Sequence, residues 1–292
     1  MRRFLKHSLL FLGVFLILAN GLSWMSLYYL RKSEFYKPSF ALQKSGEQLD
    51  YIVLGSSTGL TTLNTQTIDS ITGLQGVNLS MDDTSMPIHA LMLEHFLAQG
   101  GKVSSCVLVF DAGQMNQQTL QQSGNAYRFL PFIQEDYVAD YYRASDNTLL
   151  SRSEWLPMIG VGYYNAELFY PGLFSAIKPQ RHNRFDARGN YSYPNSGGSN
   201  KEDTDLMTFR FDNPWYKKIK AVCAANNIEL ILYHPPKFKS EVKSDTAVSN
   251  FINHSQLLQD TTFFYDELHV NSEGRQLTSV AFANEFSKRI KK

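Results

Sequence analysis

The chain has 292 residues, enough for one large or two ordinary domains, and its 28 basic and 27 acidic side chains nearly cancel. This balance excludes the basic surface typical of nucleic-acid binding, so we expect no nucleic-acid partner. The two cysteines and seven histidines show neither metal-ligand nor redox spacing, so we expect no metal and no cofactor. Whether Cys106 and Cys223 pair is left open by the sequence.

The first segment is predicted to be a membrane anchor formed by residues 1 to 30. Ser8 to Leu30 carries no charge over 23 residues, which suffices to cross about 30 Å of hydrocarbon as a helix. Aromatic residues lie near the far end of this run, as in an interfacial belt. Basic residues precede the run, which favours a cytoplasmic N-terminus and an extracytoplasmic main domain, in the periplasm or at the cell surface. A cleaved signal peptide is the alternative, but Ala19-Asn20-Gly21 is a poor cleavage site.

Residues 31 to 50 are polar and predict a linker, and residues 51 to 292 predict one α/β domain. Strand and helix patterns alternate there as in a mostly parallel sheet. The predicted strands are Tyr51–Leu54, Gly76–Leu79, Cys106–Phe110, Ile228–Tyr233 and Phe263–Tyr265. The predicted helices are Thr62–Ile71, Pro87–Gln99, Pro214–Asn226, Val248–Gln259 and Glu273–Ile290.

Residues from about 115 to 210 interrupt this alternation. They are rich in aromatic side chains and end in a turn-rich stretch, Asn190 to Asn200. We expect a partly helical insertion over the carboxyl edge of the sheet. Its aromatic residues suit sugar stacking, and a structural elaboration without a ligand is the alternative.

Polar side chains follow each predicted strand at its carboxyl end, and in a parallel sheet these ends meet at one edge. Ser57 lies in the turn Gly55–Gly59 after the first strand. Asp266 and His269 follow the fifth strand, and a spacing of three places their side chains on the same side of a turn. Asp266 can then accept the Nδ1 proton and leave Nε2 free as the general base that a serine nucleophile needs. A solvated surface turn is the alternative for this pair.

The turn Gly55–Gly59 fits two other patterns. It matches the G-x-S-x-G nucleophile elbow of α/β-hydrolases, but that elbow follows several strands and only the anchor and linker precede Tyr51. It also fits a phosphate-binding turn at a helix start. That interpretation gives Asp266 and His269 no role, and no P-loop lysine follows.

The turn Gly55-Ser56-Ser57 and the pair Asp266-x-x-His269 resemble the SGNH (GDSL-like) hydrolase superfamily. In that superfamily a serine in a Gly-Asp-Ser type turn follows the first strand, and an Asp-x-x-His pair precedes the final helix. The resemblance covers roughly residues 50 to 114 and 215 to 290. It implies a parallel-sheet, three-layer, flavodoxin-like domain with Ser57 as nucleophile and Asp266 and His269 as its partners.

The oxyanion donors of this family are not matched by residue type. The family places a glycine after the second strand and Gly-x-Asn-Asp after the third, whereas this chain has Asp83 in a run without glycine and Asp111-Ala112-Gly113-Gln114-Met115-Asn116. The resemblance therefore implies the backbone N–H of Asp83, and Gln114 or Asn116, as substitutes. His234, at the end of the fourth strand, is a further candidate for the substrate cleft.

Membrane-anchored members of this superfamily include proteins similar to the alginate O-acetylation factors and the D-alanine transfer protein of teichoic acid modification. The resemblance implies an extracytoplasmic serine esterase or O-acyltransferase that acts through an acyl-serine on a cell-envelope glycan or acylated carrier. It also implies a membrane-bound O-acyltransferase as partner. The alternative is a catalytically degenerate domain that binds glycan or scaffolds such an acyltransferase.

Overall fold

The computed structural model describes residues 1–120, 123–199, 201–244 and 248–290. They form two compact units, one from Met1–Gln43 with Tyr127–Asn183 and the other from Lys44–Ala126 with Arg184–Lys292. Among the described residues of the first unit every regular element is a helix, and the second unit contains the sheet.

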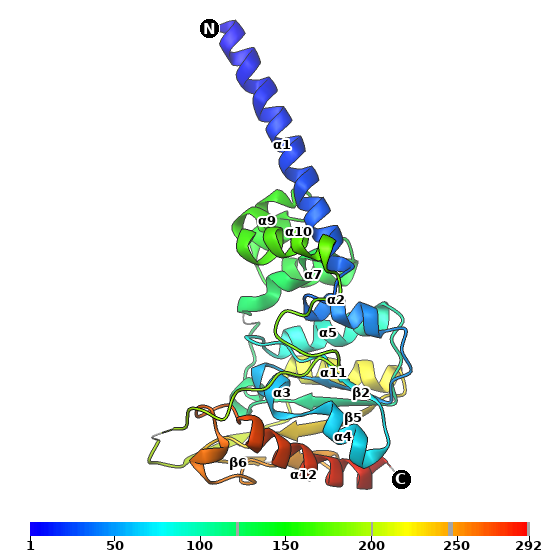
Figure 1. The fold of residues 1–292 in the computed structure, drawn as a ribbon, viewed down its shortest axis with the longest axis vertical. Helices are drawn as coiled ribbons and strands as arrows, with labels where there is room; N and C mark the ends of the chain where they lie inside the picture. Colours follow the sequence, from blue (N-terminus) through cyan, green and yellow to red (C-terminus); the bar gives the residue numbers. More distant parts are fainter. Residues whose placement is uncertain (121–122, 200, 245–247, 291–292) are drawn as a thin grey trace. The chain divides into compact units, whose positions relative to one another are not determined.

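The helical unit is built around α1 (Arg2–Arg31), which is exposed over most of its length and buries Ser23, Ser26, Leu27 and Leu30 near its C-terminal end. Of the described helices, α1 is the one long and apolar enough to cross a membrane. It contacts α9, η2 and α10 (Figure 1). The helices that follow it are α2 (Lys37–Lys44), the 3₁₀ helix η1 (Gly124–Phe132), α7 (Asp136–Ala144), α8 (Thr148–Arg152), α9 (Met158–Tyr163), the π-helix η2 (Asn165–Phe169) and α10 (Tyr170–Ile177).

Two predicted boundaries differ from this arrangement. The segment 31 to 50 is not simply a linker, because it contains α2, in which Phe40 and Ala41 are fully buried. The predicted insertion from 115 to 210 is divided: residues 127–183 belong to the helical unit, whereas residues 115–126 and 184–210 belong to the unit with the sheet. The division of the insertion is not visible from composition, because the residues on both sides of it are rich in aromatic and turn residues.

The second unit holds a five-stranded parallel sheet, which confirms the prediction of an α/β fold with a mostly parallel sheet. Its strands lie in the order β2-β1-β3-β5-β7. The chain passes from β1 to β2 on one side and then to β3 on the other side, so the sheet has a topological switch point between β1 and β3. The strands are β1 (Tyr51–Leu54), β2 (Gly76–Asn78), β3 (Ser105–Val109), β5 (Glu229–His234) and β7 (Phe251–Asn253), and a separate parallel pair is formed by β4 (Asp205–Phe209) and β6 (Ser240–Ser244).

Helices cover both faces of the five-stranded sheet, which gives three layers (Figure 1). One face carries α3 (Ser57–Thr62), α4 (Thr65–Thr72) and α12 (Ser272–Ile290), and the other carries α5 (Met86–Ala98) and α11 (Pro214–Ala225). Alternate strand residues such as Val53 and Val107 pack with Phe282 of α12 in a fully buried core, as the period of two in a strand requires. Cys106 and Cys223 are both buried free thiols.

Two predicted elements are wrong. The segment Val248–Gln259 is not a helix, because Phe251–Asn253 forms β7 and pairs with the edge of β5, which would otherwise expose unpaired backbone groups. The segment Phe263–Tyr265 is not a strand of the sheet. Thr261–Phe263 forms the 3₁₀ turn η3, and Phe264 makes an isolated bridge to Val270.

Candidate active site

Ser57, His269 and Asp266 form a continuous hydrogen-bonded chain in the α/β unit. His269 Nε2 lies 2.9 Å from Ser57 Oγ, and His269 Nδ1 lies 2.9 Å from each carboxylate oxygen of Asp266. With the Nδ1 proton donated to Asp266, Nε2 carries the lone pair that accepts the hydroxyl proton of Ser57. The sequence predicts these three residues as partners, and the structure brings Ser57 to His269 from 212 positions away.

The turn after β1 brings Ser57 to the carboxyl edge of the sheet. Ser57 is the first residue of α3, and Ser56 is its N-cap in an extended conformation. Gly55 lies so close to β3 that an added Cβ would stand 2.9 Å from the Val109 carbonyl oxygen, so only glycine fits without a shift of the chain. The first N–H groups of a helix have no intrahelical acceptor, so the N–H of Ser57 is available beside its own hydroxyl.

Asp266 holds the loop of His269 as well as its ring. Asp266 Oδ1 accepts the backbone N–H groups of Leu268 and His269, both at 2.8 Å, and Tyr265 N donates to His269 O at 2.9 Å. Partial burial raises the pKa of Asp266, but the hydrogen bonds from the His269 ring and from these backbone groups outweigh it and hold the pKa below its usual value. The carboxylate is therefore ionised at neutral pH and can stabilise an imidazolium.

A tyrosine lies beside the imidazole and a second tyrosine stacks on the first, and the sequence did not predict either position. The Tyr193 ring lies 5.2 Å from the His269 ring at an interplanar angle of 56°, and it stacks on Tyr265 at 4.2 Å with an angle of 5°. Tyr193 reaches this position through an isolated bridge to Asn271, at the start of α12. The only signal in the sequence was the aromatic content of the turn-rich stretch, which does not identify a partner.

A pocket of about 360 Å³ opens beside Ser57. Its lining is almost entirely polar, and Leu268 is the aliphatic side chain among the residues that form it. The segments that follow β1, β2, β3 and β5 all contribute, which is the convergence expected where parallel strands end. The lining residues are Ser56, Ser57, Thr58, Asp83, Thr84, Ser85, Asp111, Gln114, Gln117, Ser123, Lys237 and Leu268.

An ion pair crosses this pocket, and its cation was missed by sequence reasoning. Lys237 Nζ donates to Asp111 Oδ2 at 2.8 Å, and both side chains are mostly buried. Burial alone would raise the pKa of Asp111, but Lys237 and the N–H of Gly113 lower it, so the carboxylate stays ionised. Lys237 lies three residues after β5. The signal that could have identified it in the sequence was its charge, so close to the end of a predicted strand.

The predicted oxyanion and cleft residues fall into two groups. Asp83 and Gln114 line the pocket, and Gln114 Nε2 donates to Thr84 O at 3.0 Å. Asp83 has φ of 51°, the left-handed conformation that normally favours glycine. The structure therefore places at Asp83 the backbone shape that a glycine would supply, with a different side chain.

The structure does not place Asn116 or His234 in the pocket lining. Asn116 is exposed, and its Nδ2 donates to Thr208 O at 2.9 Å, which ties the segment after β3 to β4. His234 is buried edge-on against Phe110. Burial lowers the pKa of His234 to about 4, although the Asp111 carboxylate acts in the opposite direction, so this ring is neutral at pH 7.

The arrangement supplies the parts of covalent acyl transfer: a nucleophile, a base with a fixed tautomer, and backbone donors at the same edge. Within the described ranges no group of three or more His, Cys, Asp or Glu side chains is placed to hold a metal ion. No protein-family model and no curated protein sequence matches the chain.

Proposed function

We propose that this protein is a membrane-anchored, extracytoplasmic serine esterase or O-acyltransferase that acts on a cell-envelope glycan or its acyl groups. The hydrogen-bonded chain from Ser57 through His269 to Asp266 is the observation that carries the proposal. The strand order, the serine directly after β1 and the Asp-x-x-His pair directly before α12 support an SGNH-like fold. The exposed apolar length of α1 supports the anchor, and the resemblance adds a membrane-bound O-acyltransferase as partner.

The geometry gives each residue a step in the reaction. Ser57 Oγ attacks the acyl carbonyl while Nε2 of His269 takes its proton, and Asp266 stabilises the imidazolium. Backbone N–H groups of Ser57 and Asp83 are the candidate donors to the oxyanion. The intermediate collapses as His269 returns the proton to the departing alcohol, which leaves an acyl-Ser57. A sugar hydroxyl or water then attacks the acyl group, and the same proton transfers run in reverse.

The pocket favours a short acyl group. A long acyl chain needs an apolar channel to recover its transfer free energy of about 0.8 kcal/mol per buried CH₂. Hydroxyl, amide and charged groups form almost the whole lining instead. We therefore expect kcat/KM to fall steeply from acetyl to octanoyl esters of the same phenol. An increase with chain length would contradict this assignment.

A second candidate is a catalytically degenerate domain that binds glycan or scaffolds an acyltransferase. The observation in its favour is that Gln114 Nε2 is already engaged by Thr84 O and that no glycine follows β2. Such a domain would keep the fold and the pocket but would not acylate Ser57. Covalent labelling of the serine separates the two candidates.

The test is reaction of the full chain with a fluorophosphonate, together with hydrolysis of an acetyl ester. We expect Ser57 to be labelled, and Ser57→Ala and His269→Ala to abolish turnover while thermal unfolding is unchanged. Ser70→Ala is the matched control, because Ser70 is exposed on α4 and its hydroxyl bonds only to the local Thr67 carbonyl. Labelling that persists in Ser57→Ala would refute the assignment. An unlabelled, folded wild type would favour the degenerate domain.

A further inference from the structure

The segment from α9 to α10 exposes large apolar side chains, and the residues that α10 buries are small. From Met158 to Ile177, through α9, η2 and α10, the one charged residue is Glu167. In α10 the buried residues are Gly172 and Ser175, whereas Tyr163 and Ile177 are 69% and 77% exposed. A helix like α10 that packs on a unit surrounded by water normally shows the reverse order, with its large apolar side chains facing inward.

The same helices pack on α1 through small and polar residues. Ser26 Oγ donates to the Leu168 carbonyl at 2.7 Å, and Met158 N donates to Asn20 Oδ1 at 3.3 Å. Gly172 lies directly against Ser26 and has no room for a Cβ. Close approach at glycine and serine, with hydrogen bonds between helices, is how helices associate inside a lipid bilayer.

The positions of these contacts along α1 indicate how deep the helical unit lies in the membrane. About 20 helical residues cross about 30 Å of hydrocarbon, so a span that starts after the charge at Lys6 ends near Ser26. The contact at Asn20 lies six residues earlier, about 9 Å further into the hydrocarbon at 1.5 Å per residue. Amphipathic elements that lie in a membrane interface bury their apolar face by about 5–10 Å.

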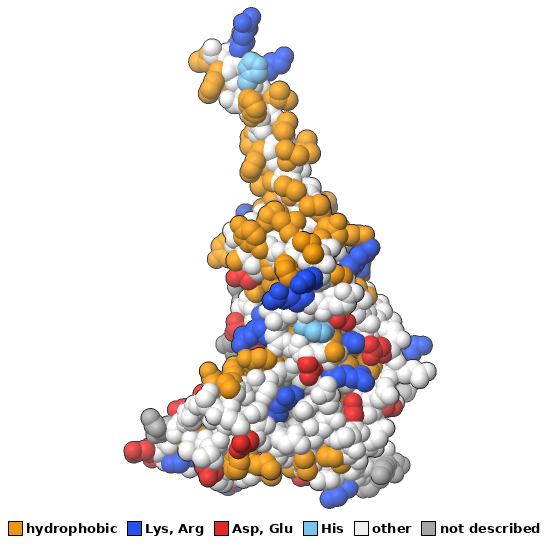
Figure 2. Space-filling model, in the orientation of Figure 1, with side chains coloured by type: hydrophobic (Ala, Val, Ile, Leu, Met, Phe, Trp, Pro, Cys, Tyr) orange, Lys and Arg blue, Asp and Glu red, His pale blue; other side chains and the backbone are white. Residues whose placement is uncertain are grey.

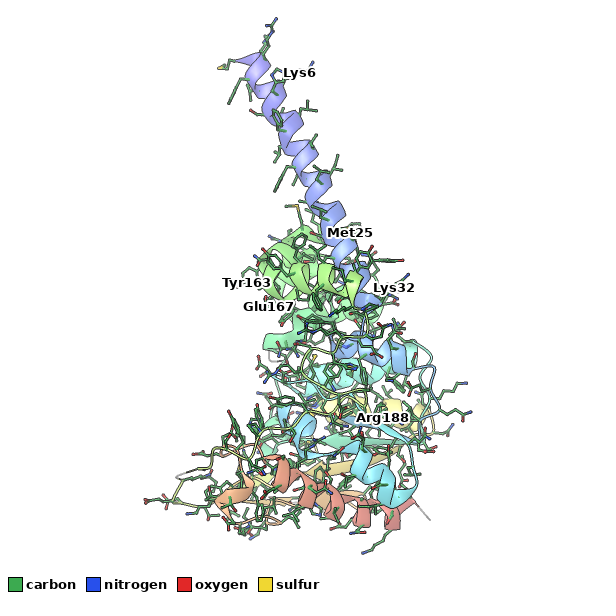
Figure 3. All side chains as sticks on the ribbon, viewed as in Figure 1. Lys6, Met25, Lys32, Tyr163, Glu167 and Arg188 are labelled. Atoms are coloured by element: carbon green, nitrogen blue, oxygen red, sulfur yellow. The ribbon has the colours of Figure 1, made fainter. Side chains whose placement is uncertain are left out.

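The side chains near the depth of the Asn20 contact are of the types found at a membrane boundary: aromatic, aliphatic and basic. Trp155, in the turn before Met158, is 81% exposed, and Leu156 beside it is also exposed. Figure 2 shows hydrophobic side chains that cover α1 and continue onto the adjoining helices of this unit. In Figure 3 Tyr163 is seen at about the level of the stretch of α1 between Met25 and Lys32. The next charged residues after the apolar run, Lys178 and Arg181, are exposed and can meet lipid phosphates.

We propose that the helical unit is embedded in the membrane interface. Its cap surface, formed by Trp155, Leu156, Tyr163, Tyr170 and Ile177, lies at the boundary between acyl chains and headgroups of the leaflet where α1 ends. This inference rests on α1 crossing the membrane, as the proposed function requires. The occupant of the cap surface is lipid, because this surface continues the apolar surface of α1 and begins at the depth where that helix is still within hydrocarbon.

The three tryptophans of the chain provide the test, because Trp24 lies in α1, Trp155 in the cap surface and Trp215 in α11 of the other unit. Full-length single-tryptophan variants, made by Trp→Phe substitution of the other two, are placed in lipid-only vesicles whose acyl chains are brominated near the glycerol or near the chain end. We expect quenching of Trp24 and Trp155, with Trp155 quenched at least twofold more by the shallow label, and no quenching of Trp215.

Each other outcome has a distinct meaning. Quenched Trp24 with unquenched Trp155 would overturn the proposal and leave the anchor intact. Absence of quenching at both sites would overturn the proposal together with the membrane anchor. Equal quenching of Trp215 would indicate adsorption of the whole chain and would also overturn it.

A charge substitution tests the cap surface directly. In the variant that retains only Trp155, Ile177→Glu should lower the quenching at least twofold, because a carboxylate at this depth is costly to bury. Leu257→Glu is the matched control, since Leu257 is an exposed leucine of the α/β unit. Equal quenching in both variants would show that the cap surface does not enter the lipid.

Discussion

Replacing Asp266 by asparagine tests the hydrogen-bonded chain with the smallest change in shape. In the native loop Asp266 Oδ1 accepts the N–H groups of Leu268 and His269 at 2.8 Å, and Asp266 Oδ2 lies 2.9 Å from His269 Nδ1. An asparagine can place its amide oxygen at the first position and so keep the loop. Its NH₂ group then opposes the Nδ1 proton at 2.9 Å, and the amide oxygen, also 2.9 Å from Nδ1, is already occupied by the two backbone N–H groups.

The imidazole of the variant is therefore expected to take the other tautomer. Nδ1 then accepts from the asparagine, and the proton resides on Nε2, which can no longer accept the proton of Ser57. In the serine-protease template the corresponding change lowers kcat by about 10⁴-fold, which corresponds to about 5.4 kcal/mol at 1.36 kcal/mol per tenfold. Because the backbone bonds remain, we expect the free energy of unfolding to fall by about 1 kcal/mol or less.

The assay is kcat/KM for acetyl-ester hydrolysis, together with the rate of fluorophosphonate labelling. Asp260→Asn is the matched control: Asp260 Oδ1 also accepts a backbone N–H, from Thr262 at 2.9 Å, but it does not contact His269. We expect the control to react at the native rate. If Asp266→Asn kept more than about a tenth of the native kcat/KM, His269 would not be the base that Asp266 orients, and the mechanism above would be wrong.

Three further results are expected. Asp83→Gly should react faster than Asp83→Ala, and Asp83→Ala should unfold about 1 kcal/mol more easily, because a Cβ without a polar group is disfavoured at φ of 51°; urea unfolding and ester hydrolysis measure both. A double-mutant cycle of Lys237→Met and Asp111→Asn in urea unfolding should show a coupling of about 1–2 kcal/mol, because the pair is largely screened from water, and a coupling near zero would contradict that pairing. Burial lowers the pKa of His89 to about 3, so below pH 6.5 the unfolded chain binds a proton that the folded chain does not, and stability falls as pH falls. Between pH 6.5 and 5 this histidine should cost about 2 kcal/mol, and His89→Leu should show a smaller loss over the same range.

The central elements of the sheet could be predicted because their signal is local. β1, β3 and β5 are continuous apolar runs, as expected of strands buried on both faces. β7 could not be predicted, since three residues do not define a period and its partner, the edge of β5, is set by the tertiary fold. The helical unit was not separable either, because buried residues such as Phe129, Phe132 and Tyr142 mark an apolar core but do not show that it is distinct from the core of the sheet.

The same distinction applies to the candidate site. Asp266 and His269 were found because they are three positions apart, and Ser57 because it follows a strand and a glycine. Lys237 reaches the site from the segment after β5 and Tyr193 from the turn-rich stretch that begins at Asn190, and no local pattern connects them to the serine. Asn116 was selected by chemical type, but the segment after β3 turns it toward β4 instead.

Motif comparison cannot identify the oxyanion donors, and the reason is physical. Any residue except proline supplies a backbone N–H, so the donor depends on the conformation of the chain and not on the side chain. Asp83 adopts the left-handed conformation without being glycine, and the bond from Gln114 to Thr84 O holds the segment after β3 against the segment that contains Asp83. A missing glycine therefore does not by itself favour a degenerate domain. A domain that only bound glycan would also gain nothing from an imidazole held 2.9 Å from a serine hydroxyl and oriented by a carboxylate, and this arrangement favours acyl transfer over binding alone.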